Sequence, residues 1–389
     1  MLPAILTALI AASCALAQPY RVAKETASGP GSPAIVVLHG PSVRAAIAPS
    51  EGGELTSLSV LHKGKWIELI YRARDYTADT AFRGKAPLLW PAVGGQYLPG
   101  STPKSSCVDG EYALGGKTYP MPCHGFAKSL RWELVASAAD SKAARATVRL
   151  RDSEKTRQSY PFGFELSATY TLAQGKLAIA YKLTASPRNE RPMIFGIGNH
   201  IAFRVPFLAG TDPGAMMFQS PSTAVMLRDE HGLLSGERGP RSFATPTRLD
   251  QFSATTALPL TGYQGDTFAE LRDPQGLSVR ITHKTAGWPA EPVVRFNVFG
   301  DPKLGYFSPE PWVGVQNSLN SRLGLIELEP GKEWMWEVEV APRPAAKQEL
   351  TAAPAPRVAP PPRSQRRRTS SSPDTPRAAP SAPCSPAAA

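Results

Sequence analysis

Apolar and polar residues alternate along much of the chain, as in β-strands with one buried face. The segment Leu177–Leu183 alternates Leu, Ile, Tyr and Leu with Ala and Lys, and Trp334–Val340 alternates Trp and Val with Met and Glu. Similar patterns, or a richness in β-branched and aromatic residues, predict strands at Ile35–Leu38, Val43–Ile47, Leu55–Leu61, Ala146–Leu150, Gly163–Thr171, Ser278–Thr282 and Val293–Phe299. No long stretch after the first 17 residues has helical periodicity. The pattern therefore predicts an all-β fold, a single large antiparallel β-sandwich.

The two ends of the chain differ from this pattern. Residues 1–17 have an apolar run and the small-residue site Ala15-Leu16-Ala17, so we expect a signal peptide and an exported protein, periplasmic or secreted. The alternative is a lipoprotein anchored through Cys14. Neither this run nor a later one is long enough to span a membrane. Residues 18–34 are expected to be an irregular lead-in and residues 35–342 the β-sandwich domain.

Residues 343–389 are rich in Pro, Ala, Ser and Arg and have almost no large apolar side chain, which predicts a disordered tail. The tail accounts for +6 of the net charge of +11, since it has eight Lys or Arg and two Asp or Glu. The body is thus only mildly cationic, and we expect no nucleic-acid partner. The tail either contacts anionic polymers of the cell envelope or is a passive solvated segment.

Three cysteines follow the expected cleavage site, namely Cys107, Cys123 and Cys384. An oxidising compartment would allow a disulfide between Cys107 and Cys123, although two separate thiols remain the alternative. The sequence has no Cys-x-x-Cys pair, so we expect no structural metal site.

Four segments of the body combine His, Glu and Trp with Gly and Pro. They are Pro87–Gly95, Tyr119–Lys128 with Trp132, Tyr160–Phe164 continuing to Phe195–Phe203, and Pro309–Gly314. In their order and motifs they resemble the aldose 1-epimerase family, nearer to a divergent branch than to galactose mutarotase. The matching motifs are His-Gly-Phe-Ala at His124–Ala127, Tyr-Pro-Phe-x-Phe at Tyr160–Phe164, Gly-x-His-x-x-Phe at Gly198–Phe203 and Glu-Pro-Trp-x-Gly at Glu310–Gly314. Each motif alone is weak, but four in order over residues 35–342 are fairly specific.

The resemblance implies a galactose mutarotase-like sandwich that interconverts the α and β anomers of a free sugar without cofactor or metal. Ring opening needs one group to take the proton of the anomeric hydroxyl and another to protonate the ring oxygen. By motif, Glu310 is the general base and His200 the general acid, while His124 hydrogen-bonds near the ring oxygen.

Further candidates for sugar binding are the polar neighbours of these motifs and one adjacent indole: Trp312, Gln96, Asn199, Gln316, Asn317 and Asp266. The sequence departs from the family at two positions. Gly95 stands where many members carry a sugar-binding arginine, and Lys128 stands where the motif has arginine. Both departures bear on which sugar is bound.

Two other functions are compatible with the same sequence. One is a carbohydrate-binding protein on this fold that does not catalyse. The other is a glycan-cleaving enzyme, which is less favoured because hydrolysis normally uses two carboxylates and only Glu310 lies in a recognisable motif.

Overall fold

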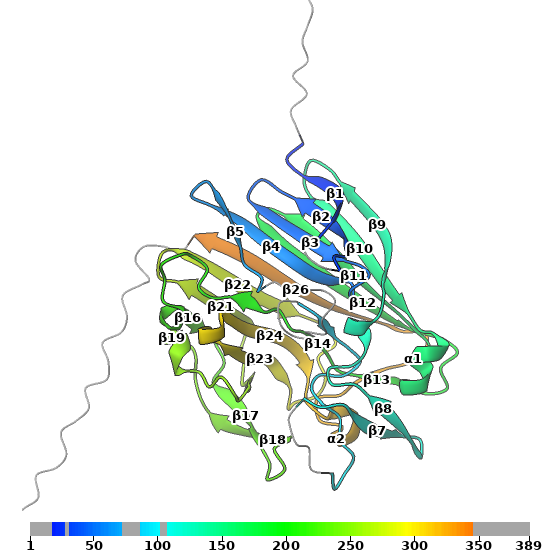
Figure 1. Ribbon diagram of the computed structural model, residues 1–389. Coiled ribbons are helices and arrows are strands. Elements are labelled where there is room, and N and C mark those ends of the chain that lie inside the picture. Colours follow the sequence, from blue (N-terminus) through cyan, green and yellow to red (C-terminus); the bar gives the residue numbers. More distant parts are fainter. Residues whose placement is uncertain (1–17, 28–30, 72–85, 102–106, 345–389) are drawn as a thin grey trace, which may run out of the picture. The chain divides into compact units, whose positions relative to one another are not determined.

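The computed structural model describes residues 18–27, 31–71, 86–101 and 107–344 (Figure 1). Within these ranges the neighbouring strands pair antiparallel. The long hairpin of β11 (Phe164–Ala173) and β12 (Lys176–Ala185) illustrates why. Its loop, Gln174-Gly175, has positive φ at both residues, as in the tight turn that matches the twist of two antiparallel strands.

Three sheets make up most of the structure. The first has the order β1-β2-β3-β4-β5, with β1 (Arg21–Thr26), β2 (Ala34–His39), β3 (Val43–Ala48), β4 (Glu54–His62) and β5 (Lys65–Glu68). The second has nine strands in the order β19-β16-β21-β22-β26-β12-β11-β10-β9. Besides β11 and β12 it comprises β9 (Glu133–Ala139), β10 (Ala144–Arg151), β16 (Met217–Gln219), β19 (Thr247–Arg248), β21 (Phe268–Asp273), β22 (Leu277–Lys284) and β26 (Glu333–Pro344).

The third sheet has eight strands in the order β18-β17-β20-β23-β24-β14-β6, with β15 also paired to β24. Its strands are β6 (Leu88–Leu89), β14 (Ile197–Asn199), β15 (Phe203–Arg204), β17 (Ala224–Arg228), β18 (Leu234–Pro240), β20 (Leu258–Thr261), β23 (Val294–Asp301) and β24 (Tyr306–Gly314). Two small pairs join β7 (Gly110–Leu114) to β8 (Lys117–Met121) and β13 (Met193–Phe195) to β25 (Ile326–Leu328).

Helices are few and short in the described part of the chain. The α-helices are α1 (Glu154–Ser159) and α2 (Ser318–Ser321), and the 3₁₀ turns are η1 (Ala127–Ser129), η2 (Pro213–Ala215), η3 (Leu249–Gln251) and η4 (Pro302–Leu304). None of them has the length and apolar character that a membrane-spanning helix needs. The all-β sandwich of antiparallel sheets predicted from the sequence is confirmed.

The sheets are stacked, and one continuous core lies between them (Figure 1). Strand β2 packs on β10 and β3 on β11, while β22 of the nine-stranded sheet packs on β24 of the third sheet. The predicted alternation explains this arrangement, because one face of β12 and of β26 is buried in the core while Met335 on the other face of β26 is 59% exposed.

Strand β1 corrects the expectation that residues 18–34 are irregular. Arg21–Thr26 pairs along its whole length with β2, although its side chains are mostly exposed. An edge strand of this kind is held by backbone hydrogen bonds, so its polar side chains give no alternation to detect. Tyr20, just before it, is buried and accepts a hydrogen bond from the backbone N–H of Gln174.

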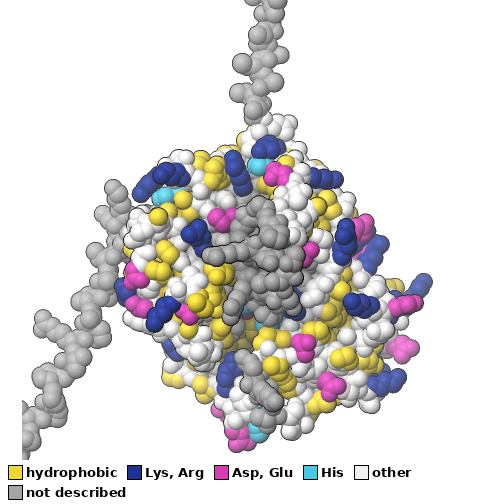
Figure 2. All heavy atoms as spheres, in the orientation of Figure 1, with side chains coloured by type: hydrophobic (Ala, Val, Ile, Leu, Met, Phe, Trp, Pro, Cys, Tyr) yellow, Lys and Arg dark blue, Asp and Glu magenta, His cyan; other side chains and the backbone are white. Residues whose placement is uncertain are grey.

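Of the other expected domain boundaries, the structure describes only some. Strand β26 runs to Pro344, two residues beyond the predicted end of the domain at 342. The predicted signal peptide and the tail from residue 345 onward lie outside the described residues. On the face shown in Figure 2, Lys and Arg are interspersed with Asp and Glu, as expected for a mildly cationic body.

Replacing Leu183 by Ala should lower the free energy of unfolding by about 2–5 kcal/mol, because Leu183 is fully buried in β12 and its loss leaves a cavity. Met335→Ala in the neighbouring strand is the matched control and should change that free energy by less than about 0.5 kcal/mol. Denaturant unfolding followed by tryptophan fluorescence measures both, and equal effects would contradict the described orientation of the two strands.

Candidate active site

Strand β24 carries Glu310 between Pro309 and Pro311 and is buried along its whole length. Proline lacks the N–H that a ladder hydrogen bond needs and is uncommon inside a sheet. On one side, β23 pairs with β24 and places Asn297 opposite Glu310. On the other side two short strands, β14 and β15, pair with β24 on either side of the proline-flanked stretch. The pairing on this side of β24 is thus interrupted at Glu310.

The register across this interruption brings His200 to Glu310. Gly198 lies opposite Trp312, and Phe203 lies opposite Phe307. The two pairs belong to the same antiparallel register, so His200 falls opposite Glu310, where facing Cβ atoms are roughly 5 Å apart. The His200 Nε2 atom is 3.3 Å from Glu310 Oε1.

Burial shifts the two pKa values of this pair in opposite directions, so that the pKa of Glu310 lies above that of His200. Glu310 is 1% exposed and His200 is 6% exposed. Burial raises the pKa of Glu310 to about 8, although hydrogen bonds from Asn297 and Trp312 act in the opposite direction. Burial lowers the pKa of His200 to about 4. Between these values the pair holds one proton, and these shifts place it on Glu310.

His124 is held by a two-point contact with Gly94. The His124 backbone N–H donates to the Gly94 carbonyl at 3.1 Å, and the Gly94 N–H donates to His124 Nδ1 at 3.0 Å. Since Nδ1 accepts, the neutral ring carries its proton on Nε2. Burial, together with the nearby His200 and Lys128, keeps the pKa of His124 well below its usual value. The residue is therefore a neutral hydrogen-bond donor.

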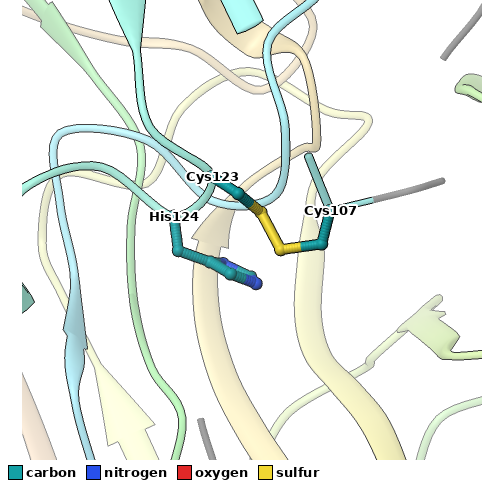
Figure 3. A group of neighbouring side chains, drawn as sticks. All are labelled: Cys107, Cys123 and His124. Carbon is teal, nitrogen blue, oxygen red and sulfur yellow. A yellow bond between two sulfur atoms is a disulfide. The ribbon is translucent and has the colours of Figure 1, made fainter. Parts of the chain in front are cut away.

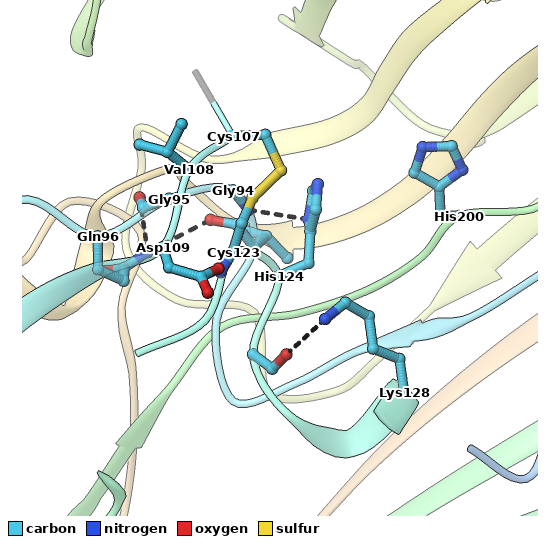
Figure 4. The surroundings of a disulfide bond; sticks show 12 residues. Gly94, Gly95, Gln96, Cys107, Val108, Asp109, Cys123, His124, Lys128 and His200 are labelled. Atoms are coloured by element: carbon cyan, nitrogen blue, oxygen red, sulfur yellow. Dashed lines mark hydrogen bonds between the residues drawn. A yellow bond between two sulfur atoms is a disulfide. The ribbon is translucent and has the colours of Figure 1, made fainter. Parts of the chain in front are cut away.

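The disulfide between Cys107 and Cys123 lies directly beside His124 (Figure 3). It joins two backbone positions whose Cα atoms are 5.4 Å apart. The two sulfurs and the His124 ring lie within 4.8 Å of one another, a grouping that in its reduced form would suit a soft metal. In the structure both sulfurs are bonded to each other and offer no thiolate. Figure 4 shows His124 between this disulfide and His200.

These residues line one cavity of about 160 Å³. Of the residues predicted from sequence, the cavity brings together His124, His200, Glu310, Trp312, Gln316 and Cys107. The indole N–H of Trp312 donates to Glu310 Oε2 at 3.1 Å.

Three other predicted sugar-binding residues are buried but are not among the residues that line this cavity. Gln96 accepts from the Leu319 N–H, and Asn317 accepts from the Tyr97 N–H. Asn199 donates to the hydroxyl of Tyr181 at 2.6 Å. Their side chains satisfy the polar groups of loops and strands around the cavity, so they support its wall.

The structure does not bring Asp266 to this cavity. Asp266 is exposed in the turn before β21 and lines a different hollow, together with His283 and Trp288. The local motif that suggested Asp266 places a carboxylate at the start of a strand. Where that strand start lies relative to the cavity depends on the order of the strands in the sheet, which a local motif does not encode.

The position of the missing family arginine is filled from within the chain. A Cβ atom built on Gly95 would lie 1.9 Å from the Tyr97 hydroxyl oxygen. Tyr97 is buried, and its hydroxyl contacts the backbone of Val108 next to the disulfide. No side chain fits at position 95 while Tyr97 stands there.

Sequence reasoning missed six residues that line the cavity, namely Arg228, Leu234, Thr255, Ala257, Asn297 and Phe299. Asn297 has a signal in hindsight, because it is a polar residue in the predicted strand Val293–Phe299. Arg228 has none, because its position depends on how β17 pairs with β18 and β20.

Comparisons with known proteins give a matching family model and similar solved structures. The family model described as "Aldose 1-epimerase" matches residues 34–232, just over half of the chain. A curated relative from Salmonella typhimurium, named "Putative glucose-6-phosphate 1-epimerase", is 26% identical over 140 residues, which cover 36% of this chain and 40% of the relative. The chain therefore matches less than half the length of that protein.

Two solved structures share the fold. A protein of Synechocystis sp. PCC 6803 is 24% identical with a TM-score of 0.62, and the match covers 82% of this chain and 99% of the other. A galactose 1-epimerase from Lactobacillus acidophilus is 16% identical with a TM-score of 0.61, covering 84% and 100%. At these identities, the structural similarity shows that this chain shares the fold of the two proteins.

Replacing both Cys107 and Cys123 by Ser should lower the free energy of unfolding by about 3 kcal/mol, since the disulfide closes a loop spanning 16 residues. Chemical denaturation of the variant and of the oxidised wild type measures the difference. Wild-type protein treated with a reductant should match the variant, and unchanged stability in both would show that the bond does not form in solution.

Proposed function

Because the chain belongs to the aldose 1-epimerase family, we propose that it catalyses the interconversion of the α and β anomers of a free sugar. The observation that carries this proposal is the buried contact of 3.3 Å between His200 and Glu310, with His124 on the same cavity. A carboxyl and an imidazole that share one proton are the groups that opening and closing a hemiacetal ring requires.

Glu310 acts as the general base. Burial favours its neutral form, so Glu310 holds the shared proton at neutral pH. A sugar hydroxyl that donates to the carboxyl group stabilises its charged form and moves the proton to His200 across their contact. Glu310 then takes the proton of the anomeric hydroxyl, and a C=O bond forms at the anomeric carbon.

His200 acts as the general acid. As the bond between the anomeric carbon and the ring oxygen breaks, the ring oxygen takes the proton from His200. The open aldehyde rotates about its first carbon–carbon bond. In closure the same hydroxyl attacks the other face and returns its proton to His200, while Glu310 returns its proton to the anomeric oxygen. Protons and electrons balance over the cycle.

His124 stabilises the charge that builds on the ring oxygen. Its Gly94 contact at Nδ1 keeps the ring proton on Nε2, so the ring donates a hydrogen bond without titrating. Trp312 offers an apolar face beside Glu310, which suits the C–H face of a sugar.

Among the described residues that line the cavity, Glu310 is the only carboxylate. Hydrolysis of a glycosidic bond normally uses two, so the geometry favours anomer exchange over glycan cleavage. The Glu310 variant below separates catalysis from simple sugar binding.

We further propose that the protein works in an oxidising compartment outside the cytosol. The disulfide beside His124 supports this proposal, because such bonds persist mainly in exported proteins.

Glu310→Gln should lower the rate constant for mutarotation by roughly 10²- to 10⁴-fold, because glutamine keeps the shape of the side chain but takes no proton. Polarimetry of freshly dissolved α-glucose or α-galactose, corrected for the spontaneous rate, measures the loss. Glu237→Gln on the exposed face of β18 is the matched control and should retain full activity. A fully active Glu310→Gln protein would exclude Glu310 as the base.

The pH profile of kcat/KM should be bell-shaped, with its maximum between about pH 4 and pH 8. Above about pH 8 the pair loses its single proton and no acid remains, while below about pH 4 it gains a second proton and no base remains. His231→Gln, at an exposed histidine, is the control and should leave the profile unchanged. A rate that rises steadily through this range would contradict a shared proton.

A further inference from the structure

Arg228 is the only lysine or arginine among the described residues that line the cavity. It lies at the end of β17, and β17 is separated from β24 by β20 and β23 in the eight-stranded sheet. Arg228 and Glu310 therefore reach the cavity from different strands. Leu227, the preceding residue, points outward and is 40% exposed.

The hydrogen bonds of Arg228 leave one edge of its guanidinium open. Nη1 donates to Gln316 Oε1 at 3.0 Å and to the Gly232 carbonyl at 2.8 Å. Both contacts use the same nitrogen, so the described residues place no acceptor on Nε or Nη2. These two nitrogens form the side of the fork that presents two parallel N–H groups.

Arg228 forms no ion pair within 4.0 Å with any carboxylate among the described residues; the charge of Asp229 acts on it only from farther away. Four other half-buried arginines do contact a glutamate: Arg149 with Glu133, Arg272 and Arg280 with Glu270, and Arg295 with Glu291. The two acceptors that hydrogen-bond Arg228 are neutral. Burial lowers the pKa of Arg228, although the charge of the nearby Asp229 acts in the opposite direction. A partly buried cation that forms no ion pair is costly, and an anion in the cavity would supply one.

We propose that Arg228 binds the carboxylate of a hexuronic acid, which makes an aldose with a carboxylate in place of its terminal hydroxymethyl group the preferred substrate. This inference rests on the proposed anomer exchange. A planar carboxylate accepts both N–H groups of the open edge, and its single charge matches one arginine. A phosphate carries between −1.5 and −2 charges at neutral pH and would bring excess negative charge into the cavity that holds Glu310.

The test compares kcat/KM for mutarotation of glucuronate and galacturonate with that for glucose, galactose and glucose 6-phosphate. Wild-type protein should prefer each uronate over its neutral hexose by roughly tenfold or more. Arg228→Met should lower the ratio of uronate to hexose kcat/KM by about 10- to 100-fold, mainly through KM, since a charged hydrogen-bonding pair is lost. Arg228→Lys should keep part of the preference, and Arg145→Met, on the exposed β10 surface, is the control that should change nothing.

A wild-type protein that prefers neutral hexoses or glucose 6-phosphate would overturn the inference. An equal loss for all sugars in Arg228→Met would also overturn it, because Arg228 would then act only through Gln316 and the cavity wall. If no sugar is mutarotated, the proposed function fails, and calorimetry decides the inference separately. Glucuronate binding that disappears in Arg228→Met would sustain it, and absence of binding to wild type would end it.

Discussion

The register between β24 and its neighbouring strands determines how the residues of the candidate site are arranged. Strand β24 lies between β23 on one side and the short strands β14 and β15 on the other, and this order sets Asn297, Glu310 and His200 in one row. The prolines that flank Glu310 remove ladder hydrogen bonds where the row crosses the sheet. A slip of one residue in either pairing would turn one of these side chains to the opposite face.

The same burial that makes the core also sets the electrostatics of the site. Glu310 and His200 have neighbours that are mainly apolar or neutral, so their charged forms are both disfavoured. A surface pair with this contact would exist as ions in water. In the sheet it is a neutral pair with one mobile proton, and His124 is kept uncharged by the same surroundings. The fold thus shifts the pKa values of the proposed base and acid through burial.

The sequence predicts those parts of this arrangement that leave a local pattern or motif, but not the parts that depend on how distant strands pair. Period-two alternation identified β12 and β26, because each buries one face. Motifs identified His124, His200 and Glu310. Strand β1 gave no signal, since an edge strand is held by its backbone. The positions of Arg228, Asn297 and Asp266 relative to the cavity depend on cross-strand pairing, and sheet order is a property of the whole chain.

The close contact between Gly95 and Tyr97 constrains which side chains can stand at position 95. An arginine at position 95 would collide with the Tyr97 ring, and removing that ring first would leave a void behind the disulfide loop near Val108. Positions 95 and 97 are in direct contact, so the effect of a side chain at position 95 depends on which residue occupies position 97.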